Sequence, residues 1–78
     1  MTKAKYVKTK NKKIIVFSEL QIHSEFKIFK PISAGFIIFN VSEDGNVSCV
    51  CFGESISLDI GSHPEDTKLA RQQIIGLY

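Results

Sequence analysis

Residues 33–52 read SAGFIIFNVSEDGNVSCVCF, and this stretch decides the fold. Ser33 to Val41 is rich in aromatic and β-branched residues and carries apolar side chains on both faces, which predicts a central strand covered on both sides. Asp44-Gly45 is a dipeptide that favours a tight hairpin turn. Val47 to Phe52 then returns as the antiparallel partner strand.

The segments before this hairpin predict a second one. Lys5 to Thr9 and Ile14 to Phe17 have strand composition, and Asn11 between them tolerates a left-handed backbone. The apolar residues of segment 18–30 fit both the period of a strand and the spacing of a helix, and we predict a short helix near 19–26. Pro31 ends it, because the residue before a proline is disfavoured in the helical conformation.

The segments after residue 52 predict one more strand and a helix. Ser55 to Ile60 alternates polar and apolar residues, which is typical of a half-buried strand. Ser62 and Glu65 resemble a capping box, and the helix is predicted from about Pro64 to Ile75. Gly76 is expected to end the helix.

These elements predict an α+β fold in a single domain, residues 1–78, with residues 1–4 disordered. Their order is β-β-(short α)-β-β-β-α, which gives a small, mostly antiparallel sheet of four or five strands with one C-terminal helix packed on it. The first strand is expected at an edge of the sheet. Ile37 should be covered on one face of the central strand. Six further side chains are expected to be largely buried, namely Phe36, Ile38, Phe39, Ile56, Leu58 and Leu69.

The composition is that of an ordinary globular domain, with 44% hydrophobic and 23% charged residues. The apolar runs Ile14 to Phe17 and Phe36 to Phe39 are far shorter than the roughly 20 residues that span a bilayer, and the first is too short for a secretory signal. Cys49 and Cys51 are too close together to form a disulfide framework. We therefore expect a reduced, cytoplasmic protein without membrane contact.

Cys49 and Cys51 are also candidate metal ligands, and His23 and His63 would complete a set of four. An extended C-x-C holds its sulfurs roughly 6–7 Å apart along a strand, whereas structural zinc sites draw their cysteine pairs from a turn. We interpret both cysteines as core residues, and we expect neither a metal nor another cofactor.

His23-Ser24-Glu25 contains the residue types of a catalytic triad, but triads are assembled from separate elements rather than from sequence neighbours. We interpret these three as surface residues, and His63 as exposed at the helix start. Ser33-Ala34-Gly35 is small enough to let a ligand or a second backbone approach closely, or to make room for packing under the helix. Because the sequence holds no phosphate-binding or nucleophile motif, we expect no enzyme activity.

Residues 1–13 carry six lysines and no acidic residue, whereas residues 14–78 carry four basic and eight acidic side chains, a net charge of −4. The basic segment is a candidate nucleic-acid surface, because lysines pair with phosphates and aromatic rings stack on bases. The same lysines could instead protect an edge strand from aggregation. The candidate contact residues are Lys3, Lys5, Tyr6, Lys8, Lys10, Lys12 and Lys13.

Most of the chain resembles small bacterial or phage-borne hypothetical proteins. The segments that carry the resemblance are Pro31-Ile32-Ser33-Ala34-Gly35-Phe36, Asp44-Gly45, Gly53-Glu54-Ser55-Ile56-Ser57-Leu58 and Asp66-Thr67-Lys68-Leu69-Ala70. The resemblance implies a bacterial cytoplasmic setting. That group has no assigned activity, so no functional residue is carried over.

The sequence therefore favours a small, non-enzymatic binding or adaptor module with a protein partner, which includes self-association through exposed strand edges. The alternative is a nucleic-acid-binding domain that uses the basic N-terminal segment. No small-molecule ligand is implied.

Overall fold

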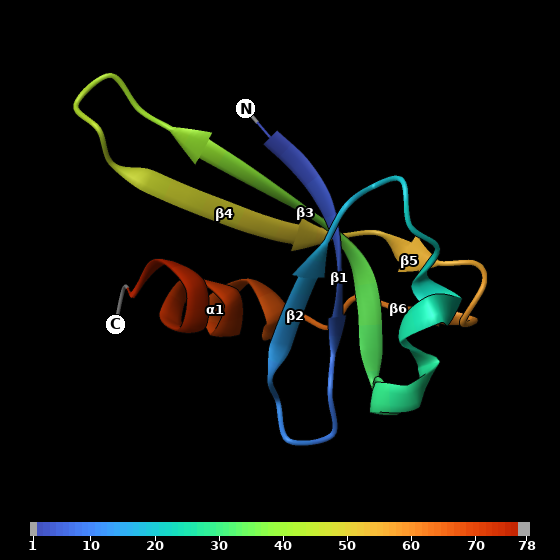
Figure 1. Cartoon of the computed structure of the whole chain (residues 1–78). Helices are drawn as coiled ribbons and strands as arrows, with labels where there is room; N and C mark the ends of the chain where they lie inside the picture. The colour runs from blue at the N-terminus through green and yellow to red at the C-terminus, as the bar shows by residue number, and fades with distance from the viewer. Residues whose placement is uncertain (1, 77–78) are drawn as a thin grey trace.

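The computed structural model describes residues 2–76, which form an α+β domain built on a four-stranded antiparallel sheet (Figure 1). The strands lie in the order β2-β1-β3-β4, and a separate two-stranded sheet pairs β5 with β6. The predicted fold class is confirmed. The elements are β1 (Thr2–Lys8), β2 (Ile14–Phe17), the 3₁₀ helix η1 (His23–Phe29), β3 (Ser33–Val41), β4 (Val47–Phe52), β5 (Glu54–Ser55), β6 (Ile60–Gly61) and α1 (Asp66–Ala70), which continues as the π-helical turn η2 (Arg71–Ile75).

The hairpin of β3 and β4 forms as predicted. Its turn closes with a hydrogen bond of 2.9 Å from the Ser42 N–H to the Asn46 carbonyl oxygen. Gly45 has a φ of +86°, a left-handed conformation that is costly for residues with a Cβ. The resulting register places Phe36 directly opposite Phe52 on the neighbouring strand.

β1 is an interior strand, so the prediction that it forms a sheet edge is wrong. It pairs with β2 on one side and with β3 along its whole length on the other. Thr2 to Ala4, which the sequence predicted to be disordered, belong to β1 and pair with residues 37–39 of β3. The edges of the sheet are β2 and β4. The lysines of β1 therefore do not protect an edge.

Side chains from the C-terminal helix cover backbone groups at both edges of the sheet. On β4, the Cys51 N–H donates to Thr67 Oγ1 over 2.9 Å. On β2, the Ile14 N–H donates to Gln73 Oε1 over 2.7 Å. Such outward-facing groups are the ones that pair with an added strand. The helix thus blocks strand addition at these positions.

The sheet is covered on its two faces by different elements, which lie on opposite sides of it in Figure 1. We call the two sides the helix face and the pocket face. On the helix face, α1 and η2 pack over a core of Tyr6, Ile14, Ile37, Cys49 and Ala70. On the pocket face, η1 and the β5–β6 hairpin pack around Val7, Phe17 and Ala34.

The two helical segments begin later than predicted. η1 starts at His23 rather than near residue 19, and Lys30 ends it in a left-handed conformation ahead of Pro31. The C-terminal helix starts at Asp66 and ends, as predicted, at Gly76 with a φ of +80°. Instead of the predicted pair of Ser62 and Glu65, the Asp66 carboxylate accepts the backbone N–H of His63.

The predicted core is correct at Ile37, which is fully buried, and wrong at Ile56, which is 90% exposed. The alternation of residues 55–60 predicted one strand, but these residues turn back on themselves between β5 and β6. The Leu58 N–H donates to Ser55 Oγ, and Asp59 has a positive φ. This turn directs the Ile56 side chain into solvent. Five other expected core residues are only half-buried, namely Phe36, Ile38, Phe39, Leu58 and Leu69.

Replacing Ile37 and Ile56 by alanine, one at a time, tests this core. Ile37→Ala should lower the free energy of unfolding by about 2–5 kcal/mol, because it removes buried methyl groups and leaves a cavity. Ile56→Ala should change it by less than about 0.5 kcal/mol, because the side chain is already in water. Urea titrations followed by circular dichroism measure both values. A larger loss at position 56 than at position 37 would contradict the assignment.

Candidate functional site

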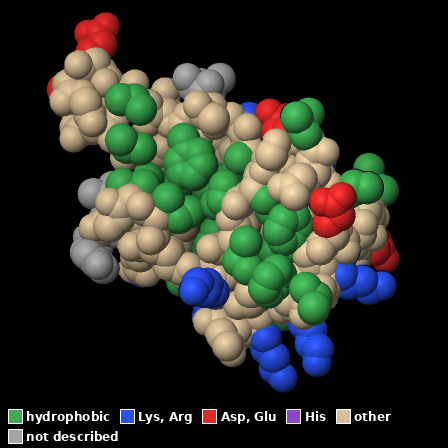
Figure 2. All heavy atoms as spheres, viewed as in Figure 1, with side chains coloured by type: hydrophobic (Ala, Val, Ile, Leu, Met, Phe, Trp, Pro, Cys, Tyr) green, Lys and Arg blue, Asp and Glu red, His purple; other side chains and the backbone are tan. Residues whose placement is uncertain are grey.

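Strand alternation divides the candidate contact residues of β1 between the two faces of the sheet. Tyr6 and Lys8 lie on the helix face and are fully buried, so neither can touch a nucleic acid, which corrects the sequence-based set. Lys3 and Lys5 lie on the pocket face. Figure 2 shows Lys and Arg side chains gathered at the end of the molecule where the β1–β2 turn lies, whereas acidic ones lie at the tip of the β3–β4 hairpin and at other places on this face. The exposed lysines around the β1–β2 turn are Lys10, Lys12 and Lys13.

Lys8 binds three groups that the start of the C-terminal helix brings together. Its ammonium nitrogen lies 2.6 Å from Asp66 Oδ1, 2.7 Å from Glu65 Oε1 and 3.2 Å from His63 Nδ1. An ammonium carries three N–H donors, so each donor has an acceptor nearby. Burial alone lowers the pKa of Lys8, but its interactions with Asp66 and Glu65 outweigh burial and raise that pKa above its ordinary value. Lys8 is therefore charged, and its ion pairs with Glu65 and Asp66 connect β1 to the start of α1.

The Asp66 carboxylate is fully buried and accepts three further hydrogen bonds. Its Oδ2 accepts from the Tyr6 hydroxyl at 2.5 Å, from Ser33 Oγ at 2.8 Å and from the His63 N–H at 2.9 Å. Burial raises the pKa of this carboxyl, but Lys8 and the three donors together hold it below its ordinary value. Burial and the bond to Asp66 raise the pKa of Tyr6, so its phenol stays protonated and donates.

His63, Glu65 and Asp66 offer ligand atoms that lie within 4.8 Å of one another, as in a metal site. The Lys8 ammonium lies among these atoms, in the position that a metal cation would take. A metal ion bound there would have to displace a buried ammonium and leave it without a partner, which is strongly unfavourable. We interpret the cluster as an ammonium site that holds α1 on the sheet.

Cys49 and Cys51 lie on the helix face of β4. Cys49 is buried in the core with Ile37 and Ala70, and Cys51 packs half-buried against the same cluster. Burial raises the pKa of both thiols, that of Cys51 to about 12. A raised pKa disfavours the thiolate that nucleophilic attack requires. The packing of both side chains in this cluster supports their interpretation as core residues.

His23 is buried, so its interpretation as a surface residue is wrong. Its ring lies edge-on to the rings of Phe17 and Phe36, and its Nε2 lies 2.8 Å from the Gly35 carbonyl oxygen, to which it donates. Burial lowers the pKa of His23 below its ordinary value. Ser24 and Glu25 are exposed, as predicted.

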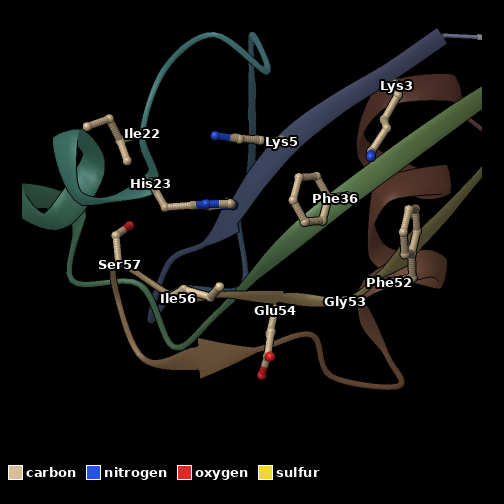
Figure 3. Close-up of a pocket in the computed structure, with 10 residues that line it drawn as sticks. All are labelled: Lys3, Lys5, Ile22, His23, Phe36, Phe52, Gly53, Glu54, Ile56 and Ser57. Atoms are coloured by element: carbon tan, nitrogen blue, oxygen red, sulfur yellow. The ribbon is translucent and has the colours of Figure 1, made fainter.

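A pocket of about 580 Å³ opens on the pocket face (Figure 3). Phe36 and Phe52 from β3 and β4 form one part of its wall, Ile22 precedes η1, and Ile56 projects from the β5–β6 turn. Side chains from three separate regions of the chain thus converge on one cavity. Its remaining lining residues are Lys3, Lys5, His23, Gly53, Glu54 and Ser57.

The pocket carries positive charge beside its aromatic wall. Lys3 reaches over the Phe36 ring, with Nζ 4.6 Å from the ring centroid. Lys5 Nζ donates to the Gln21 carbonyl oxygen over 2.7 Å, which orders this lysine at the pocket. In Figure 3 the Glu54 carboxylate points away from the cavity. The two lysines therefore place positive charge beside the aromatic wall.

Phe36 and Phe52 are functional candidates that sequence reasoning missed. Their rings lie 5.9 Å apart between centroids and are tilted by 31°, and Phe52 is 37% exposed. The apolar residues on both faces of β3 predicted a covered strand, and with it a core position for Phe36. The signal that could have found the pair is the register of the Asp44-Gly45 hairpin, which sets both rings on one face.

The small residues before Phe36 let a second backbone approach, which was one of two expectations for Ser33-Ala34-Gly35. A Cβ on Gly35 would lie 2.4 Å from the Phe52 carbonyl oxygen. Any larger residue at position 35 would therefore force the backbone at the end of β4 to shift.

Comparison with known proteins finds no family model, curated protein or solved structure that matches this chain. Within residues 2–76, none of the helices has the length and apolar character needed to cross a bilayer.

Asp66→Asn tests the buried ion pair. It should lower the free energy of unfolding by about 3–5 kcal/mol, because it leaves the Lys8 ammonium buried without a full counter-charge. Glu65→Gln is the matched control, since Glu65 binds the same ammonium from an exposed position and should cost far less. Urea titrations of both variants measure the difference. Equal losses would show that the buried pair does not hold the helix.

The lowered pKa of His23 predicts a stability loss in mild acid. In the unfolded chain this histidine takes up a proton near pH 6.5, whereas in the folded protein it does so only at lower pH. The free energy of unfolding therefore keeps its full value above pH about 6.5 and decreases below it. The slope should approach about 1.4 kcal/mol per pH unit until the folded pKa is reached. Asp66 adds a further loss only below pH about 4.

Urea titrations at several pH values, on the wild type and on His23→Gln, measure this slope. The variant should lose the fall below pH about 6.5 whatever its absolute stability. A wild-type profile that is flat in this window would contradict the assignment of His23 as a buried neutral ring.

Proposed function

We propose that this protein is a non-enzymatic binding module and that the pocket on the sheet face opposite α1 is its binding surface. The observation that carries the proposal is the convergence of exposed apolar side chains on one cavity. Ile22, Phe52 and Ile56 are all substantially exposed and all line it. A cavity of about 580 Å³ is within the size range of ligand sites.

The state of the reactive groups supports a binding role over a catalytic one. The thiols of Cys49 and Cys51 have raised pKa values, and the Nε2 of His23 is committed to a backbone carbonyl. Lys8 and Asp66 neutralise each other inside the fold. Groups committed in this way stabilise a structure and are poorly placed to exchange protons with a substrate.

The pocket favours a ligand that carries a flat or apolar group next to a negative charge. Phe36, Phe52 and Ile56 offer apolar contact, and Lys3 and Lys5 offer positive charge on the same side. An apolar group gains by leaving water, and an anion gains from the two ammonium groups. Binding at the pocket should therefore weaken when either the apolar wall or the charge is removed.

The sequence suggested a protein partner in a bacterial cytoplasm. In this proposal such a partner binds at the pocket and not at a strand edge. The sequence predicts a protein partner through pairing at an exposed strand edge. Thr67 and Gln73 cover edge groups of β4 and β2, which makes strand addition there unfavourable.

Anilinonaphthalene sulfonate, an aromatic dye with one negative charge, tests the proposed surface. Its fluorescence should rise on binding the folded wild type, and Ile56→Asp should weaken its affinity roughly tenfold by placing an anion in the apolar wall. Ile28→Asp is the matched control, because Ile28 is 83% exposed and is not among the pocket residues.

Circular dichroism melts confirm that each variant is folded before the dye is added. If the dye does not bind the wild type, or if it binds Ile56→Asp and Ile28→Asp with equal affinity, the pocket is not the binding surface.

A further inference from the structure

The pocket face presents an aromatic pair on an open sheet surface. Phe36 and Phe52 are directly opposite each other on neighbouring strands, and their centroids are 5.9 Å apart. Buried core rings would have been fully covered, yet Phe52 is exposed and Phe36 is only half-buried. Exposed rings on a sheet are stacking platforms for unpaired bases, and stacking tolerates any base because each has a flat face.

Two lysines lie beside these rings at a strand spacing. Lys3 and Lys5 are two residues apart on β1, so both point to the pocket face, and they lie opposite Ile38 and Phe36. Lys3 lies over the Phe36 ring itself. A nucleotide likewise carries its phosphate a short distance from a flat ring, so the arrangement complements a chain of nucleotides.

The surface beside the aromatic pair extends the same pattern. Val50 lies opposite Ile38 on β4, on the face that also carries Phe36 and Phe52, and it is exposed. The face therefore continues as an apolar strip across β3 and β4 with lysines along its β1 side. A strip of this kind suits an extended strand of bases and offers nothing that matches the groove of a duplex.

We infer that the ligand of the pocket is a single-stranded nucleic acid, with a base stacked on the exposed Phe52 ring and phosphates paired with Lys3 and Lys5. A second base stacks on Phe36 when the Lys3 ammonium moves from that ring to a phosphate. The inference rests on the binding surface proposed above and names its ligand class. It differs from the sequence-based alternative in its residues. Tyr6 and Lys8 are structural, and the lysines of the β1–β2 turn lie outside the contact.

The test measures the fluorescence anisotropy of a labelled oligothymidylate of about ten nucleotides, a length that spans one small binding fold. The wild type should bind it, and the affinity should fall steeply between about 50 and 200 mM salt as counterions return to the phosphates. A duplex of the same length should bind at least tenfold more weakly.

Two matched pairs of variants separate stacking from charge. Phe52→Leu should weaken binding roughly tenfold or more, because leucine keeps the apolar contact and removes the flat ring. Phe29→Leu, at a 47% exposed phenylalanine of η1, should leave binding unchanged. Lys3→Gln combined with Lys5→Gln should weaken binding more than Lys10→Gln combined with Lys13→Gln, although both pairs remove two charges.

The outcomes distinguish this inference from the proposed function. If the dye binds at the pocket but the oligothymidylate does not bind at low salt, the nucleic-acid inference is overturned and the binding module stands. If a poly-glutamate chain binds as tightly as the oligothymidylate, the pocket recognises negative charge without bases, and the nucleic-acid inference is overturned. If the oligothymidylate binds but responds only to Lys10 and Lys13, the contact is the basic turn and the inference is again overturned.

Discussion

Lys8 and Asp66 are both fully buried, and their charged atoms lie 2.6 Å apart between β1, an interior strand of the sheet, and the first residue of the C-terminal helix. Neither charge is tolerable in the interior without the other. Tyr6 of β1 and Ser33 of β3 also donate hydrogen bonds to Asp66, so this one carboxylate links β1, β3 and α1. The position of the helix over the sheet depends on this contact.

Placing the helix on one face determines what the other face can do. The helix reaches both sheet edges through Thr67 and Gln73, and the opposite face carries Val50 and Phe52 as exposed apolar groups. On that face η1 and the β5–β6 turn cover only part of the sheet, and the gap between them is the pocket. The lysines of β1 are divided between the same two faces. Lys8 lies on the helix face and stabilises the fold, whereas Lys3 and Lys5 lie on the pocket face, where a ligand can reach them.

The sequence predicted the features that depend on neighbouring residues, such as turns and helix ends. It missed the features that depend on contacts between residues far apart in the chain. The turn at Gly45 and the helix end at Gly76 were predictable because a left-handed residue is a local requirement. Lys8 looked like a surface lysine, because its partners Glu65 and Asp66 lie near the other end of the chain. Ile56 looked like a core residue, because the alternation of residues 55–60 is the same for a strand and for a hairpin turn of this kind. The aromatic pair was hidden for a related reason, since composition alone does not tell a covered sheet face from an open one.

Amide chemical shifts of the isotope-labelled protein, recorded by NMR while oligothymidylate is added, test the central claim that the lysines are divided by strand alternation. The account predicts that the largest shifts fall on Lys3, Lys5, Phe36, Phe52 and Gly53, with little change in α1 or in the β1–β2 turn. Shifts confined to residues 10–13, or spread evenly over both faces of the sheet, would contradict it.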